Sequence, residues 1–108
     1  MAYQSPGYFV ATPPADTPTP FNVTLAAADV AEDLATVPAL KTGRSFTLKN
    51  KGPGSVFLAF DADATTADVE IEAKDNYSEV NIEIGTKISF IGEAGKTPRV
   101  FGVLWSGD

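Results

Sequence analysis

The sequence predicts an all-β protein, a small antiparallel β-sandwich or barrel, with an extended Pro-rich N-terminal arm. Short segments in which apolar and polar residues alternate recur through the C-terminal part of the chain, separated by loops rich in Gly, Pro and Asp. The first twenty residues hold five of the eight prolines, and the first forty contain neither Lys nor Arg. We therefore expect an extended docking arm over residues 1–20 and one β-sandwich domain over residues 21–108.

A first hairpin is predicted between Arg44–Asn50 and Val56–Phe60, which flank a loop with two glycines and a proline. In the first segment Phe46 and Leu48 alternate with polar residues, as in a half-buried strand. The second segment is apolar throughout, as in a strand that is covered on both faces. Antiparallel pairing of the two would place Phe46 opposite Phe60.

A second hairpin is predicted between Asp68–Lys74 and Glu79–Ile84, with Asp75–Ser78 as its turn. This pairing would set Glu70 against Glu83 on the outer face. Paired carboxylates can catalyse glycoside hydrolysis, but two solvated glutamates are the simpler interpretation.

Three further strands are expected, at Phe21–Leu25, Lys87–Ile91 and Arg99–Trp105. The last carries apolar residues on both faces, which indicates a central strand or one covered by another subunit. The spacing of Asp29 and Glu32 matches a capping box and predicts one or two helical turns there.

Composition excludes several kinds of chemistry. The chain has no Cys and no His, so disulfides, thiolate nucleophiles and histidine bases are absent. Its net charge of −6 argues against nucleic acid as a ligand. No run approaches the roughly 20 apolar residues of a membrane-spanning helix, and the N-terminus does not have the pattern of a secretory signal. We expect no catalytic residue, no cofactor, no metal and no membrane partner.

One acidic segment has an alternative interpretation. Asp61, Asp63 and Thr65, with Glu72 further along, echo the spacing of a calcium-binding loop. Thr66 stands where such a loop needs its turning glycine. An ordinary acidic loop is the prediction, and calcium binding the alternative.

The segments Phe46–Asn50 and Val56–Phe60, joined by a glycine loop, resemble small virion proteins of tailed bacteriophages. So does Gly85–Gly92 followed by Arg99–Trp105, and the resemblance extends over about residues 44–105. It implies a capsid decoration (cement) protein, or a head or tail accessory protein, that is located in the virion and is not an enzyme. It also implies a homo-oligomer, with a trimer favoured, whose extended arm clamps the major capsid protein or another virion subunit.

The residues expected to contact that partner are apolar members of the arm and the single tryptophan. They are Tyr3, Tyr8, Phe9, Pro13, Pro14, Pro18, Pro20 and Trp105. The alternative function is a carbohydrate- or receptor-binding β-sandwich module. It would use Tyr77, expected in a turn, together with Trp105, because exposed aromatic rings can stack on sugars.

Overall fold

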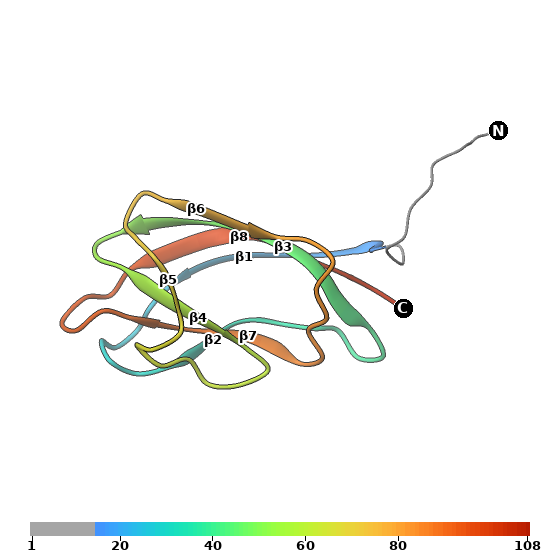
Figure 1. Ribbon diagram of the computed structural model, residues 1–108, viewed down its shortest axis with the longest axis horizontal. Coiled ribbons are helices and arrows are strands. Elements are labelled where there is room, and N and C mark those ends of the chain that lie inside the picture. The colour runs from blue at the N-terminus through green and yellow to red at the C-terminus, as the bar shows by residue number, and fades with distance from the viewer. Residues whose placement is uncertain (1–14) are drawn as a thin grey trace.

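The computed structural model describes residues 15–108, which fold into two antiparallel four-stranded sheets packed face to face (Figure 1). The strands are β1 (Thr17–Thr24), β2 (Glu32–Thr36), β3 (Thr42–Gly52), β4 (Val56–Phe60), β5 (Val69–Ile71), β6 (Asn76–Glu79), β7 (Lys87–Gly92) and β8 (Arg99–Gly107). This part of the chain contains no helix. The prediction of a small all-β antiparallel sandwich is confirmed.

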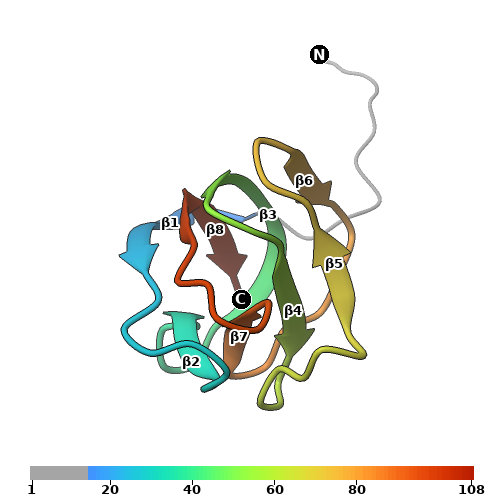
Figure 2. The same ribbon diagram turned by 90° about the vertical axis from the view of Figure 1, so that its left-hand side faces the viewer.

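The two sheets are named here after their central strands. The β8 sheet has the order β1-β8-β3-β6 and forms the upper layer in Figure 1, and the β7 sheet has the order β2-β7-β4-β5 and forms the lower layer. Figure 2 shows that β5 and β6, which follow one another in the chain, lie at the same side of the sandwich. β8 lies between β1 and β3, so the last strand is central, as one of the two interpretations of its apolar faces predicts.

Side chains from the inner faces of both sheets fill the space between them. Phe46 and Leu104 from the β8 sheet and Phe90 from the β7 sheet are fully buried, and Leu58 is nearly so. The rings of Phe46 and Phe60 meet edge to face with their centroids 5.4 Å apart, which joins the two layers directly. One contiguous core therefore holds the sheets together.

The predicted hairpin between Arg44–Asn50 and Val56–Phe60 is wrong, although both segments are strands. β3 pairs with β8 and β6, whereas β4 pairs with β7 and β5, so the two strands belong to opposite sheets. Phe46 does contact Phe60, but across the core rather than along a ladder. Both strands carry an apolar face that must cover the same core, and the loop between them crosses from one layer to the other.

A buried amide fixes this crossing between the layers. The Asn50 side chain is fully buried, and its Nδ2 donates to the carbonyl oxygens of Gly54 at 3.0 Å and Ile71 at 2.9 Å. Its Oδ1 accepts the main-chain N–H of Gly52 at 2.8 Å. Asn50 thus ties the end of β3 to the crossing loop and to β5.

The second predicted hairpin, Asp68–Lys74 with Glu79–Ile84, is also wrong. β5 pairs with β4 in the β7 sheet, and β6 occupies the predicted turn Asp75–Ser78 and pairs with β3 in the β8 sheet. Tyr77 lies opposite Leu48 in this ladder. Tertiary pairing of a strand-forming aromatic residue therefore overrides the local turn composition.

Two differences concern the beginning of the described chain. The first strand starts at Thr17 rather than Phe21, because the preceding four residues already pair with β8. The helical turns expected from Asp29 are wrong, since β2 occupies this segment and pairs with β7. The Glu32 carboxylate accepts the N–H of Ala26 at 2.7 Å, so it stabilises the loop before β2 instead of capping a helix.

Candidate functional site

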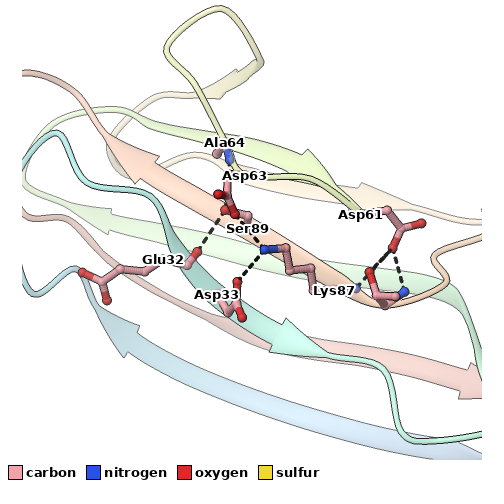
Figure 3. Close-up of polar contacts among 8 residues, drawn as sticks. Glu32, Asp33, Asp61, Asp63, Ala64, Lys87 and Ser89 are labelled. Carbon is pink, nitrogen blue, oxygen red and sulfur yellow. Dashed lines mark hydrogen bonds and ion pairs between the residues drawn. The ribbon is translucent and has the colours of Figure 1, made fainter.

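Within residues 15–108, a loop covers one broad side of the sandwich and none covers the other. Loop 61–68 lies over the outer side of the β7 sheet, where Ala64 joins a small buried apolar cluster. The N–H of Ala64 donates to Ser89 Oγ at 3.0 Å, and this hydroxyl donates to the carbonyl oxygen of Glu32 at 3.1 Å (Figure 3). On the β8 sheet, by contrast, outward side chains such as Trp105 remain exposed. The open side is the better candidate for binding.

The outward side chains of the β8 sheet form rows across the strands, and we call this surface the outer face. The rows are Pro18, Trp105 and Ser45; then Pro20, Val103, Thr47 and Ser78; then Asn22, Phe101, Lys49 and Asn76; with Thr24, Arg99 and Lys51 beyond. Residues between them in sequence, such as Val100 and Leu104, are buried in the core. Strict alternation along each strand therefore separates the outer face from the core.

One end of the outer face is apolar. Pro18, Pro20, Val103 and Trp105 are cross-strand neighbours there, and we call these four residues the apolar end. Trp105 is 38% exposed, which is unusual for a large ring in the centre of a sheet. Both prolines lie on β1, an edge strand, and neither has an N–H to offer. This edge therefore offers a poor template for an added strand, while its face remains available for packing.

The other end of the outer face is hollowed, and polar side chains border an apolar floor there. A trough of about 460 Å³ lies over β3, β6 and β8. Its lining comprises Thr47, Leu48, Lys49, Asn76, Tyr77, Ser78, Phe101 and Gly102, and we call it the polar trough. Gly102 allows β3 and β8 to approach closely, because a Cβ at this position would collide with the carbonyl oxygen of Thr47.

The charge of the outer face is opposite to that of the chain. The net charge of the sequence is −6. Yet the outward positions of the four described strands of the β8 sheet carry Lys49, Lys51 and Arg99 and no carboxylate. Arg99 Nε donates to the Asn22 side-chain oxygen at 2.9 Å, and Lys51 Nζ lies 5.5 Å from the centroid of the Phe101 ring. The acidic protein thus presents a locally positive face.

Acidic residues gather instead around the β7 sheet, where they serve the fold (Figure 3). Lys87 Nζ lies 2.7 Å from Asp63 Oδ1 and 3.1 Å from Asp33 Oδ1. The hydrogen bond to Asp63, followed by that to Asp33, raises the pKa of Lys87. These contacts join the start of β7 to β2 and to loop 61–68.

The Asp61 carboxylate is held by main-chain amides. It accepts the N–H groups of Gly85 at 2.9 Å, Thr86 at 2.7 Å and Lys87 at 3.2 Å, and the Thr86 hydroxyl at 2.9 Å. The hydrogen bond from Gly85, followed by that from Thr86, lowers the pKa of Asp61 from 3.8 to about 2. Residues 15–108 contain no group of three Asp or Glu side chains placed to hold a metal ion. The calcium alternative for this loop therefore gains no support there.

Three of the residues expected to bind a partner come together. Pro18, Pro20 and Trp105 share the apolar end, with Pro18 directly opposite Trp105. The remaining five, Tyr3, Tyr8, Phe9, Pro13 and Pro14, lie outside the described residues.

Other sequence candidates are not brought together. Tyr77 lies in β6 rather than in a turn, and its ring packs 5.7 Å from that of Phe46. Burial, assisted by Glu79, raises the pKa of its hydroxyl. Glu70 is on β5, whereas Glu83 Oε2 lies 3.7 Å from Arg44 Nη1, so the predicted carboxylate pair does not form.

Sequence reasoning missed the polar trough. Phe101 lies opposite Lys49 of β3, and Lys49 lies opposite Asn76 of β6, so the trough spans three strands that are distant in sequence. The sequence feature that points to this surface is the alternation along β8, which separates the outward residues Phe101 and Trp105 from the buried positions.

Comparison with known proteins gives no further guide. No model of a protein family matches the chain, and a search of curated proteins finds no match either. Within residues 15–108 there is no helix of the length and apolar character needed to cross a membrane.

Proposed function

We propose that the protein is a structural component of a bacteriophage particle that decorates or cements the capsid. It would bind the major capsid protein or another virion subunit, and it would do so as a homo-oligomer, with a trimer favoured. The observation that supports this proposal best is the apolar end, where the single tryptophan of the chain stands exposed on the outer face beside Pro18. Exposed apolar surface rimmed by polar residues is typical of protein interfaces, and tryptophan is enriched there.

The position of β1 connects this surface with the N-terminal segment. The residues before Thr17 include the aromatic and proline side chains that were expected to bind a partner. A partner seated on Pro18 and Trp105 would lie next to Thr17, where β1 begins. The face and the segment can therefore form one continuous contact surface.

The prolines of β1 favour a particular mode of contact. Along an antiparallel strand, alternate residues direct their N–H groups toward the neighbouring strand or away from it. Pro18 and Pro20 have the same parity, so both can be accommodated if they occupy the positions whose amides would point away from β8. The free edge then lacks donors at both positions. We expect the partner to pack against the outer face rather than to extend the sheet.

The test is binding to phage heads that lack the protein. Heads from a phage in which the gene for this chain is disrupted are mixed with the purified protein and sedimented. We expect the wild type to sediment with the heads, and Trp105→Ala and a chain lacking residues 1–14 to remain in solution. Val80→Ala is the matched control, because Val80 is 69% exposed and lies outside the outer face.

Two results would contradict the proposal. One is a wild-type protein that stays in solution, and the other is a Trp105→Ala variant that sediments as well as the wild type. Sedimentation velocity of the isolated protein tests the oligomer separately, since a monomer at every concentration would exclude a stable trimer.

The alternative is a carbohydrate- or receptor-binding module, for which the sequence suggests Tyr77 and Trp105. Trp105 is exposed, whereas the Tyr77 ring packs against Phe46 and is half-buried. The polar trough supplies another aromatic residue, Phe101, which is 37% exposed and surrounded by hydrogen-bonding side chains. This trough is the observation that favours a saccharide ligand.

A further inference from the structure

The polar trough has a chemistry that the apolar end does not share. It combines Lys49, neutral polar side chains and the exposed ring of Phe101 in a hollow of about 460 Å³, and Lys51 lies beside that ring. That volume falls within the range of about 300–1,000 Å³ that is usual for small-molecule sites. We propose that the polar trough binds an acidic saccharide, whose sugar units carry carboxylate or sulfate groups.

Charge is the first argument for this ligand. Neither Lys49 nor Lys51 has a carboxylate within ion-pairing distance in the part of the chain that the structure describes. Lys49 Nζ makes only a long hydrogen bond, 3.4 Å, to the carbonyl oxygen of Lys74. The acidic residues next to this part of the sheet are Asp75, in the turn before β6, and Glu79, on the inward side of β6, and neither forms an ion pair with Lys49 or Lys51. The ammonium groups at the trough are thus available to an anion.

The neutral side chains are the second argument. Thr47, Asn76 and Ser78 are exposed and line the trough on β3 and β6. Hydroxyl and amide groups both donate and accept hydrogen bonds, as sugar hydroxyls do. A site for an acidic protein segment would need mainly cations. The mixture of hydroxyl, amide and ammonium groups found here suits a sugar that carries both hydroxyls and an anionic group.

The aromatic ring is the third argument. Phe101 lies across from Lys49 on the neighbouring strand, and Lys51 Nζ lies 5.5 Å from its ring centroid. Lys51 Nζ lies over the ring face, so a sugar that packs against the exposed part of the ring would place its anionic group near this cation. Neighbouring strands are about 4.8 Å apart, so Phe101, Lys49 and Asn76 together extend about 10 Å across the sheet. A short oligosaccharide can contact all three.

The experiment is an NMR titration of the full-length ¹⁵N-labelled protein at low salt. The probes are a hexamer of galacturonic acid, its methyl ester, a heparin hexasaccharide, a ten-residue poly-glutamate peptide and a ten-nucleotide single-stranded DNA. We expect saturable shifts at Thr47, Lys49, Asn76 and Phe101 with the galacturonate or the heparin oligosaccharide. The uncharged methyl ester should bind about tenfold more weakly or not at all.

Variants locate the site. Lys49→Gln and Phe101→Ala should each weaken binding about tenfold, and both positions face outward, so the fold should persist. Lys96→Gln is the control for charge, because Lys96 is exposed in the loop between β7 and β8 and lies outside the trough. Trp105→Ala should bind the saccharide as the wild type does. That result would separate this site from the proposed capsid contact.

The proposal is overturned if neither acidic saccharide gives saturable shifts at the trough, or if the methyl ester binds as tightly as the acid. It is also overturned if the peptide or the DNA binds there more tightly than both saccharides, since the ligand would then belong to another class. Equal losses of affinity in Lys49→Gln and Lys96→Gln would reduce the interaction to general charge attraction and would likewise exclude the site.

Discussion

The Asp61 carboxylate is predicted to stabilise the fold by an amount that depends on pH. Asp61 directly follows β4, with φ of 61°, and accepts three main-chain N–H groups at the start of β7. We consider Asp61→Asn, because asparagine tolerates the same left-handed backbone and keeps one acceptor oxygen. The change therefore removes the negative charge with little added strain.

The size of the effect follows from the pKa. Lowering the pKa of Asp61 from 3.8 to about 2 corresponds to about 2.4 kcal/mol in the free energy of unfolding, if the whole shift arises on folding. The side chain is exposed, so solvent screening reduces this value, and we expect Asp61→Asn to lower the free energy of unfolding by roughly 1 kcal/mol at pH 7. Because the folded-state pKa is lowered, the contribution is present above pH 3.8 and is lost as the pH falls through about 2.

The assay is urea unfolding followed by circular dichroism, from pH 7 down to the lowest pH at which both proteins fold. The other carboxylates are common to both proteins, so the difference between wild type and variant isolates Asp61. The difference between the two free energies of unfolding should decrease steadily as the pH falls below 3.8. Asp75→Asn, at an exposed position, is the control and should change little. A difference at pH 7 below about 0.3 kcal/mol, or one that does not vary with pH, would refute the reasoning.

Two further predictions concern packing, and urea unfolding at pH 7 measures both. Asn50→Ala should lower the free energy of unfolding by about 2–4 kcal/mol, because it leaves buried main-chain groups unpaired. A decrease below about 1 kcal/mol would show that water replaces the amide as their hydrogen-bond partner. Gly102→Ala should cost at least about 2 kcal/mol, because the new methyl group meets the backbone of β3. Gly85→Ala, where the nearest atom would be 3.6 Å from the new Cβ, is the control, and equal costs at the two glycines would contradict this explanation.

The sequence predicted strands better than their pairing. Period-2 alternation identified β3, β7 and β8, because burying one face is a local requirement that leaves its trace in each segment. Pairing is not local. Sequence reasoning joined Phe46 and Phe60 as cross-strand neighbours, whereas their rings meet across the core. Two strands that bury the same core have the same apolar–polar alternation in their sequences, whether they pair in one sheet or face each other from opposite sheets.

The candidate binding surface was predicted only in part. Pro18, Pro20 and Trp105 were all chosen for their apolar character, and cross-strand register brings them together. The polar trough could not be predicted, because Lys49 and Phe101 become neighbours only when β3 and β8 pair. Tyr77 was misplaced for a related reason, since the turn composition around it concealed a strand.

We propose that the outer face, with Trp105 at its apolar end, is the surface by which the protein attaches to a capsid. A cryo-electron microscopy reconstruction of phage heads saturated with the purified protein tests it most directly. The account predicts a sandwich on the head surface, with the β8 sheet toward the capsid and Trp105 within the contact. Heads without added density, or sandwiches bound through the β7 sheet with Trp105 facing solvent, would contradict it.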